Sequence, residues 1–436
     1  MCKAEYVEGA RPPGALLPSR GAERRGRGRE ATARDQRARL EAAMVAAVAD
    51  HGFPRTTVSE VVAIAGVSKT TFYQHFENKQ ACFLDTFQTI VDGVTARVGE
   101  AYRSGAGPEE RLAEAFSRFA EIVCEESEVA SFVIVDSLSL GAAAVQHRRR
   151  AAESFERMIR QSFRHAPGEV TPSDLAVRLI VAGVESVVYR CLREGCPERL
   201  AGHLGPLSDW ALSLQRETVL SPIPLPPRQG AEPAGDRVPW DEPPDSPLSR
   251  SELTQRERML RAVAQVAAEV GYEALSVPAI SAAAGTSNQT FYEHFDGKRE
   301  AFIAAFDELT HRARRAMLAT SGREVEWFAA IQSGVRSLLE FVIAEPLFAR
   351  LAFFELPTAG AEALDHADAT IAQFTAFLGP GALPESLAPV PPVIVDAIAG
   401  GTWAAIQHEI AGGRGPELVD IAPELAAAIL APVRPR

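Results

Sequence analysis

The segment that decides the fold reads TFYQHFENK at residues 71–79, and it recurs as TFYEHFDGK at residues 290–298. Each copy follows the same small-residue turn, AGVS at 65–68 and AGTS at 284–287. The copies are displaced by 291 − 72 = 219 residues, about half of the 436-residue chain. A repeat of this size indicates two copies of one domain rather than a solenoid of short units.

The match extends well beyond this segment. At the same offset and without a gap, the matched pairs include Arg37 with Arg256, Gly52 with Gly271, Phe83 with Phe302, and Asp136 with Glu355. Near the end of each half, Gly183 pairs with Gly400 at an offset of 217, as one small deletion would produce. Each half is therefore predicted to be a complete copy.

Composition limits the class of protein. The length predicts two or three domains and the repeat selects two, each long enough to bury a sizeable core. The five cysteines are odd in number and form no CxxC pair, so neither a zinc site nor a disulfide framework is expected. The sequence shows no signal peptide and no run of about 18 apolar residues, which predicts a soluble, cytoplasmic protein without membrane contacts.

Charge is distributed unevenly along the chain. The net charge of −12 argues against nucleic acid, yet residues 8–40 carry nine arginines against four acidic residues. This Gly- and Arg-rich composition is typical of a disordered tail. Two interpretations remain open, a solubilising extension or an arm that lies along DNA.

Helix signals surround the first copy of the repeated segment. Apolar spacing over 36–51 predicts a helix that stops at Gly52, and Thr57 with Glu60 forms a capping box that opens a second helix over 58–65. Gly66 makes the turn, and Ser68 can cap a third helix that includes 70–75. Helix, tight glycine turn and helix together predict a helix-turn-helix.

The second copy carries equivalent signals. Ser276 is expected to take the first cap, with Pro278 inside the first turn, where a missing N–H is tolerated. Ser287 is expected to take the second cap.

Long helical patterns follow each motif, and no strand pattern is evident, so the fold class is predicted to be all-α. The helical stretches are expected at 79–103, 109–125, 127–163 with breaks, 173–195, 298–320, 324–343, 346–378 with breaks, and 391–412. Nine prolines between Ser221 and Arg250 forbid a continuous helix and predict an extended linker.

A helix-turn-helix followed by Phe-Tyr-x-His-Phe-x-x-Lys and a helical body resembles a TetR-type transcriptional regulator, here in two copies fused head to tail. The resemblance covers nearly everything except the tail and the linker, and its motif is specific because all elements are present twice. Family members bind DNA as dimers, usually hold a small effector in the body, and release DNA when it binds. The resemblance therefore implies a ligand-responsive repressor.

With the resemblance, the chain divides into six parts. We expect a basic disordered tail (1–35), a first helix-turn-helix domain (36–88), a first helical effector and dimerisation domain (89–215), a Pro-rich linker (216–252), a second helix-turn-helix domain (253–307) and a second helical effector and dimerisation domain (308–436).

The residues expected at DNA fall into two matching sets. The first turn of a recognition helix enters the major groove, where short polar side chains and lysine reach base edges. The first set is Thr57, Ser68, Lys69, Thr70, Thr71, Tyr73, Gln74, His75 and Lys79; the second is Ser287, Asn288, Gln289, Thr290, Tyr292, His294 and Lys298. By resemblance the tyrosines, histidines and lysines contact phosphates, which suits their hydroxyl, imidazole and ammonium groups.

Other interpretations of these residues stay open. The histidines can be structural, and Lys79 and Lys298 can be solvated lysines that open the next helix. Phe72, Phe76, Phe291 and Phe295 are predicted to be core. Glu293 replaces Gln74 of the first copy, so the second motif is expected to bind DNA weakly or to read a different half-site.

The bodies offer weaker signals. Two late helices resemble the helix that family members pack into a four-helix dimer interface; their apolar residues are Leu179, Val184, Val188 and Leu192 in the first half and Ile394, Ile398, Trp403 and Ile406 in the second. Seven phenylalanines, at 328, 341, 348, 353, 354, 374 and 377, make the second body richer in aromatics, and a core is favoured over a pocket for them. Asp136 and Glu355 lie in matching apolar surroundings, either as anchors for an effector or as helix-end or surface residues. The effector-binding residues stay unknown.

Two other function classes are the alternatives to a DNA-binding regulator. An enzyme is not expected, because the sequence has no GxGxxG, Walker, GxSxG or HExxH motif and no histidine-carboxylate cluster, and no cofactor or metal is expected either. A binding module with one or both DNA motifs degenerate, acting through effector or protein contacts, is the alternative to a regulator. The expected partners are double-stranded DNA and a small-molecule effector, with the two halves forming a pseudo-dimer within one chain or the whole chain forming a homodimer.

Overall fold

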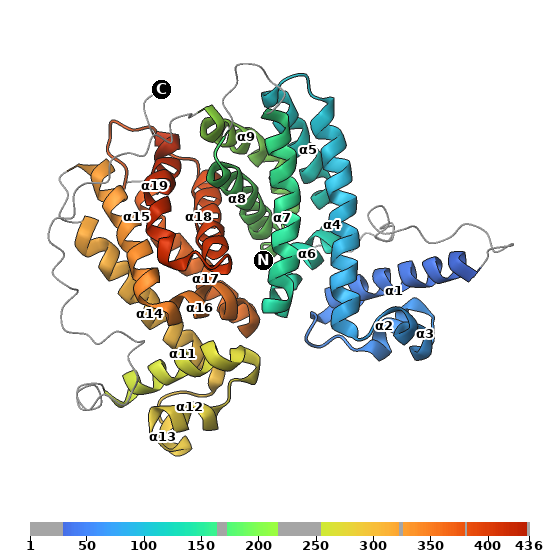
Figure 1. Cartoon of the computed structure of the whole chain (residues 1–436), viewed down its shortest axis with the longest axis horizontal. Helices are drawn as coiled ribbons and strands as arrows, with labels where there is room; N and C mark the ends of the chain where they lie inside the picture. The colour runs from blue at the N-terminus through green and yellow to red at the C-terminus, as the bar shows by residue number, and fades with distance from the viewer. Residues whose placement is uncertain (1–28, 164–171, 217–253, 322–325, 380–381, 434–436) are drawn as a thin grey trace. The chain divides into compact units, whose positions relative to one another are not determined.

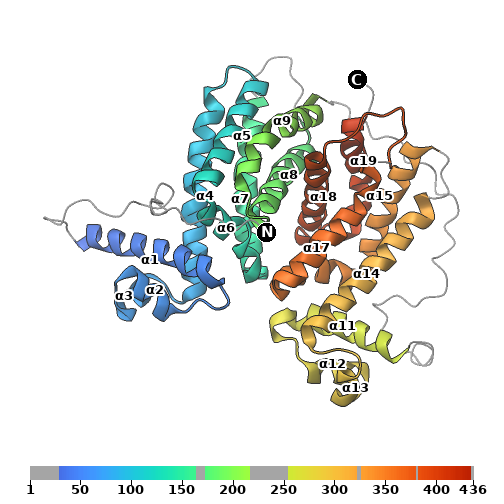
Figure 2. The ribbon, with the colours of Figure 1, turned by 180° about the vertical axis from the view of Figure 1, so that it is seen from behind.

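The computed structural model describes residues 29–163, 172–216, 254–321, 326–379 and 382–433. Across these ranges every regular element is a helix, which confirms the all-α prediction (Figures 1 and 2). The tail before Arg29 lies outside the described residues, and so do residues 217–253, which include all but the first residue of the predicted linker (216–252).

The first helix-turn-helix consists of α1 (Arg29–His51), α2 (Val58–Ala65) and α3 (Lys69–His75). Gly52 ends α1 with a φ of +81° and Gly66 ends α2 with a φ of +62°, a backbone region that favours glycine. The start of α1 corrects the tail boundary, because residues 29–35 are helical although they were assigned to the disordered tail.

The first body follows the predicted order of helices, with one addition. It contains α4 (Lys79–Ser104), α5 (Pro108–Glu125), α6 (Ser127–Ile134), the 3₁₀ turn η1 (Asp136–Leu140), α7 (Ala142–Phe163), α8 (Asp174–Arg193), η2 (Pro197–Arg199) and α9 (Leu200–Arg216). The last of these, α9, was not predicted as a helix. The rings of Phe83 and Phe132 stack at 4.0 Å and are buried, which joins α4 to α6 in the core.

The second helix-turn-helix repeats the first. It consists of α11 (Gln255–Ala274), α12 (Val277–Ala284) and α13 (Asn288–Tyr292), and α14 (Lys298–Ser321) leads from it into the body. Gly271 breaks the helical path inside α11 with a φ of +81°, the same value as Gly52. Figure 1 shows α12 and α13 together on one side of α11.

The second body is built from α15 (Trp327–Ala344), α16 (Pro346–Arg350), a π-helical turn η3 (Leu351–Glu355), η4 (Leu356–Ala359), α17 (Ala361–Phe374), η5 (Ala376–Leu378), α18 (Pro392–Ala411), η6 (Gly415–Ile421), α19 (Ala422–Leu430) and η7 (Ala431–Val433). The helix α19 was not predicted. A π-helical turn is rare and recurs at functional sites in helical proteins.

One described helix bears on the expectation of a protein without membrane contacts. By length and composition α15 could cross a membrane, although 44% of it is buried inside the protein. A core helix of a soluble protein has the same composition, so this is weak evidence for a membrane span.

The chain forms two compact units, and they do not divide at the predicted linker. Among the described residues, the first comprises 29–155 together with Val188–Leu204, and the second comprises those within 156–187 together with those within 205–433. Most of α8, from the first repeat, therefore belongs to the same compact unit as the whole second body.

Within the second unit, α8 crosses α18 in antiparallel fashion. As residue numbers rise along α8 they fall along α18, since Arg178 meets Glu409 and the Ser186 hydroxyl donates to the Asp396 carbonyl at 3.4 Å. The crossing is close at the two repeat-equivalent glycines. A Cβ at Gly183 would lie 2.8 Å from the Ala397 carbonyl oxygen, and one at Gly400 would lie 2.1 Å from Ser186 Cβ. Only glycine fits at both positions without displacing a neighbour.

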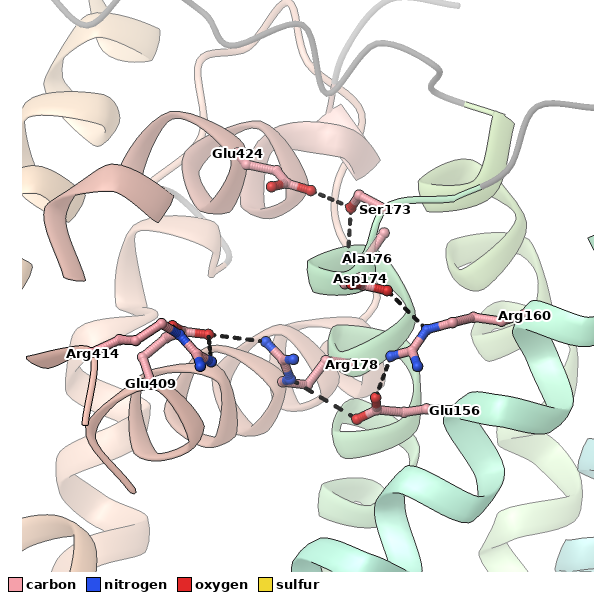
Figure 3. Close-up of polar contacts among 9 residues, drawn as sticks. All are labelled: Glu156, Arg160, Ser173, Asp174, Ala176, Arg178, Glu409, Arg414 and Glu424. Carbon is pink, nitrogen blue, oxygen red and sulfur yellow. Dashed lines mark hydrogen bonds and ion pairs between the residues drawn. The ribbon is translucent and has the colours of Figure 1, made fainter. Parts of the chain in front are cut away.

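A row of charged side chains borders this crossing (Figure 3). Arg178 on α8 pairs with Glu409 on α18 at 3.2 Å and with Glu156 on α7 at 3.9 Å. The Arg414 guanidinium donates to both oxygens of Glu409, at 2.6 and 3.1 Å, and these hydrogen bonds lower the pKa of that carboxyl. Since Glu156 and Glu409 are buried, the arginines supply the pairing that buried carboxylates require.

A further polar contact joins the start of α8 to α19. The Ser173 hydroxyl donates to the Glu424 carboxylate and accepts from the Ala176 amide at 3.0 Å (Figure 3). The polar row therefore extends from α18 to α19, and both are helices of the second repeat.

Candidate nucleic-acid interface

The N-terminal turn of α3 is the first reading turn, the part of the recognition helix expected to contact base edges, and a serine caps it. The Ser68 hydroxyl accepts from the Thr71 amide at 3.0 Å, and the two hydroxyls lie 2.9 Å apart. This confirms the predicted cap and leaves Lys69 and Thr70 exposed on the first turn of α3. Gln74 is exposed one turn later, so all three side chains are accessible to a partner and are of types that can read base edges.

The second reading turn has the same geometry. The Ser287 hydroxyl accepts from the Thr290 amide at 3.1 Å and lies 3.0 Å from the Thr290 hydroxyl. Asn288 and Gln289 are exposed on the first turn of α13, and Glu293 is exposed at its end. The two repeats thus present one scaffold with different reading chemistry.

The aromatic pairs divide into buried and exposed members. Phe72, Phe76, Phe291 and Phe295 are buried, which confirms their prediction as core. Tyr73 and Tyr292 are 58% and 59% exposed, and each ring meets its preceding phenylalanine edge-on at 5.4 and 5.5 Å. Large exposed aromatics in equivalent places favour an external partner, and the phenol hydroxyl suits a phosphate oxygen.

The histidines are half-buried. His75 Nε2 lies 3.5 Å from the Gln36 side-chain oxygen, so the ring faces α1. Burial first, and then the charge of Arg37, lower the pKa of His75. Both effects favour the neutral imidazole, which acts as a hydrogen-bonding group rather than a cation. His294 is half-buried at the matching position.

The lysines of the two motifs are occupied inside the protein. Lys79 Nζ donates to the carbonyls of Phe53, Pro54 and Thr56 at 3.1, 3.3 and 3.0 Å, and it lies 4.5 Å from the centre of the Phe53 ring. An ammonium has three donors, so these carbonyls use all of them. This geometry favours holding the loop after α1 over the phosphate contact expected from the sequence.

Lys298 lies in the same way in the second copy. Its Nζ donates to the carbonyls of Tyr272 and Glu273 at 3.2 and 3.0 Å, and it lies 4.9 Å from the centre of the Tyr272 ring. The repetition of this arrangement indicates a structural role in both motifs.

The predicted first caps differ between the copies. Thr57 and Glu60 form the expected capping box on α2, so the Thr57 side chain, although exposed, already serves the helix. Ser276 stands at the matching place, but its side chain makes no capping hydrogen bond, which corrects that prediction. Pro278 lies in the first turn of α12, as predicted.

Sequence reasoning missed the arginines of α1 as supports of the motif. Arg39 donates to the carbonyls of Ala65 and Gly66, where α2 ends. The Arg37 guanidinium lies 5.0 Å from the centre of the Phe76 ring, and Arg256 repeats this over Phe295 at 5.3 Å. The repeat match of Arg37 with Arg256 could have predicted this contact, because a charged residue kept at the same place in both copies of a helix suggests a specific role.

A buried carboxyl lies behind the first motif. Arg37 Nε donates to Glu41 Oε1 at 3.2 Å and also pairs with Asp85. Burial, then the neighbouring Asp85 charge, raise the pKa of Glu41 to about 7. The second repeat has Leu260 at the position equivalent to Glu41, so this titrating group belongs to the first repeat.

The second body contains a cavity of about 60 Å³. Helices α14, α15, α17, α18 and α19 and the π-helical turn contribute its walls. Phe348, Phe353, Phe374 and Phe377 are among the lining residues, so four of the aromatics assigned to the core face a hollow.

The glutamate that sequence analysis paired with Asp136 has a helix-end role. Glu355 is buried, and its Oε2 accepts from the Tyr272 amide at 3.0 Å, beside the break at Gly271. Among the described residues none forms a hydrogen bond or ion pair with the Asp136 carboxyl, and burial raises its pKa to about 6.

Comparison with known proteins supports the motif assignment. The sequence profile of the family described as "Bacterial regulatory proteins, tetR family" matches residues 40–86 and again 259–305. The HTH-type transcriptional activator FasR of Mycolicibacterium smegmatis (strain ATCC 700084 / mc(2)155) is 30% identical over 94 residues, which are 22% of this chain. The match spans 43% of that relative, less than half its length.

Two solved structures each resemble part of the chain. The fatty acid degradation regulator FadR from Bacillus halodurans is 18% identical with a TM-score of 0.37, over 42% of this chain and 99% of that one. A TetR family transcription regulator from Marinobacter aquaeolei VT8 is 22% identical with a TM-score of 0.35, over 41% of this chain and 97% of that one.

Proposed function

We propose that this chain, which belongs to the tetR family of bacterial regulatory proteins, is a sequence-specific regulator of transcription in the cytoplasm and not an enzyme. The observation that carries the proposal is the pair of capped reading turns, each with exposed polar side chains and an exposed tyrosine. Selecting bound sites from a random pool of duplexes tests it. A pool that shows no enrichment at low salt would leave no basis for sequence-specific binding.

Fewer residues are proposed to contact DNA than the sequence analysis predicted. Base reading is assigned to Lys69, Thr70 and Gln74 in the first copy and to Asn288 and Gln289 in the second, because these side chains are exposed. Ser68, Thr71, Ser287 and Thr290 shape the turn, and Tyr73 and Tyr292 contact phosphates. Thr57, His75, Lys79 and Lys298 stabilise the motif through contacts within the protein, and His294 is assigned the same role because it is half-buried at the position that matches His75.

The two repeats act as a pseudo-dimer within one chain. The antiparallel crossing of α8 and α18 supports this, since it places equivalent glycines of the two repeats at one contact, as a two-fold interface does. Light scattering at micromolar concentration tests it against a homodimer of fused chains. A mass near twice 46.9 kDa that persists on dilution would exclude the monomeric form.

The preferred operator is asymmetric. Lysine favours the acceptors of guanine, whereas asparagine and glutamine pair with adenine, each good contact contributing ~1–3 kcal/mol of discrimination. Lys69→Ala should therefore relax preference in one half-site, and Asn288→Ala in the other. If selected sites are palindromic and either variant alters both halves equally, each operator is read by identical motifs from separate chains.

The regulator responds to a small molecule held in the second body, and it acts as a repressor. The cavity between α14, α15, α17, α18 and α19 supports the first part. A reporter gene behind the selected operator tests the second, because a repressor lowers expression and an activator raises it. The similar protein FasR is described as a transcriptional activator, so raised expression would favour that role over repression.

One observation favours a different function for the second motif. Glu293 is exposed beside its reading turn, and a carboxylate near phosphates repels them unless it accepts from a cytosine amino group. A protein in which only the first motif binds DNA would show half the salt dependence of one that uses both. Asn288→Ala should weaken operator affinity only if the second motif binds DNA, so the affinity of this variant, measured together with the wild-type slope, separates the two cases.

A further inference from the structure

The cavity of the second body has a lining that restricts the chemistry of its occupant. Among the described residues that line it, none is charged, and the only hydroxyl groups belong to Thr375 and Thr402. An ionised carboxylate or ammonium in such a place would lose its hydration without gaining a partner. Charged ligands are therefore disfavoured.

The two threonines are in different states. The Thr375 hydroxyl donates to the carbonyls of Ile371 and Ala372, at 3.2 and 3.4 Å, so its proton is already used within α17. The Thr402 hydroxyl on α18 is buried and finds no hydrogen-bond partner among the described residues. A buried hydroxyl without a partner costs free energy that a ligand group could recover.

The rest of the lining is aromatic and aliphatic. Phe353 and Trp403 meet at 4.2 Å between ring centres on one side, and Ile406 follows Thr402 by one helical turn. Such walls stabilise hydrocarbon by removing its surface from water, about 0.8 kcal/mol for each buried CH₂ group.

We propose that this cavity binds an uncharged molecule, mainly hydrocarbon, whose single hydroxyl or carbonyl group hydrogen-bonds to Thr402. The cavity volume of about 60 Å³ corresponds to roughly four to six water-sized groups, so a short chain fits the enclosed part. The proposal deepens the ligand response proposed above by giving the class of effector.

The experiment compares 1-hexanol with hexanoate at pH 7.5, using the full chain without DNA. Binding is followed by saturation-transfer NMR of the ligand protons, and dissociation constants come from titration. Hexanol should bind at least tenfold more tightly than hexanoate, because the carboxylate meets no cation in the cavity.

A matched pair of variants tests the role of the hydroxyl. Thr402→Val keeps the side-chain volume and should weaken hexanol binding about twofold to tenfold, the range expected for one neutral hydrogen bond. Thr375→Val removes a hydroxyl from the same lining that is already satisfied, so hexanol affinity should stay at the wild-type value. Far-UV circular dichroism confirms that both variants are folded.

Two outcomes would overturn the inference. Hexanoate binding as tightly as hexanol would show that the cavity accepts charge, and an unchanged hexanol affinity in Thr402→Val would remove the polar anchor. The outcome for the proposed function is separate, because operator binding is measured afterwards. If hexanol binds with the stated preferences and leaves operator affinity unchanged, the ligand class stands and the ligand-responsive regulator does not.

Discussion

The carboxylate of Glu355 is expected to hold the break in α11. Gly271 interrupts that helix, which leaves the Tyr272 amide without a helical partner, and Glu355 Oε2 accepts from this amide at 3.0 Å. Hydrogen bonds to charged groups contribute about 1.5–3 kcal/mol when both groups are withdrawn from water. Glu355 is buried and Tyr272 is half-buried, so we expect the lower part of that range.

Replacing Glu355 with methionine keeps the length of the side chain and removes both acceptor oxygens. The Tyr272 amide should then exchange with solvent deuterium roughly tenfold faster, since 1.4 kcal/mol corresponds to a factor of ten. Local exchange is the suitable readout, because a methionine in an apolar site can raise global stability while the break loosens. Glu355→Gln retains one acceptor oxygen and should give a smaller increase.

Asp136→Asn provides the control from the equivalent position of the first repeat. The Asp136 carboxyl forms no hydrogen bond with any described residue, so the Phe53 amide should exchange as in the wild type. Equal exchange of Tyr272 in Glu355→Met and in the wild type would refute the reasoning. So would a faster Phe53 amide in Asp136→Asn, because the two repeats would then use their carboxyls alike.

Three further predictions concern other contacts. Burial raises the pKa of Glu41 to about 7 from its ordinary 4.5. Between pH 4.5 and 7 the folded protein therefore binds more protons than the unfolded chain, and the free energy of unfolding should fall as the pH rises through that window. Glu41→Gln should flatten this slope in thermal unfolding measured from pH 4.5 to 8. Lys79→Met removes three donors to backbone carbonyls and should lower the unfolding temperature and weaken operator binding without changing the preferred sequence, which site selection would check. Gly400→Ala places a Cβ 2.1 Å from Ser186 Cβ and should destabilise the protein by ~1–3 kcal/mol in denaturant unfolding, whereas Gly202→Ala, with open space around it, should not.

Local signals predicted the helix-turn-helix well. The capping box at Thr57 and the left-handed backbone conformation of Gly66 affect only residues that are close in the sequence, so both can be predicted from residue types and spacing. The start of α1 was missed for the opposite reason. The Gly- and Arg-rich tail suggests disorder, yet arginine is itself a good helix former, and the helix continues through residues 29–35.

The roles of the motif lysines could not be predicted. Lys79 donates to backbone carbonyls 23 to 26 residues earlier in the chain. Every residue has a backbone carbonyl, so the amino-acid sequence does not indicate which carbonyls accept these hydrogen bonds. The same holds for α9, which contains Pro206 inside the helix and therefore has a weak helical pattern. Sequence similarity located the late glycines as a matched pair, but the close approach that requires them depends on how α8 meets α18.

The two repeats hold the same backbone break by different means, and the difference has a consequence for regulation. In the first repeat the Thr56 hydroxyl donates to the Gly52 carbonyl at 3.0 Å, so the helix-turn-helix domain closes its own break. In the second, Leu275 replaces that threonine, and Glu355 reaches the break from the body.

Glu355 is the last residue of the π-helical turn η3. Phe353 of the same turn lines the cavity, and its backbone carbonyl accepts a hydrogen bond from the Gln407 side chain of α18 at 2.6 Å. A ligand that displaces this turn therefore acts on α11, and the Glu355 hydrogen bond is one of the contacts that transmits the displacement. Because the first repeat closes its break within its own domain, a cavity ligand should alter reading of the second half-site more than the first.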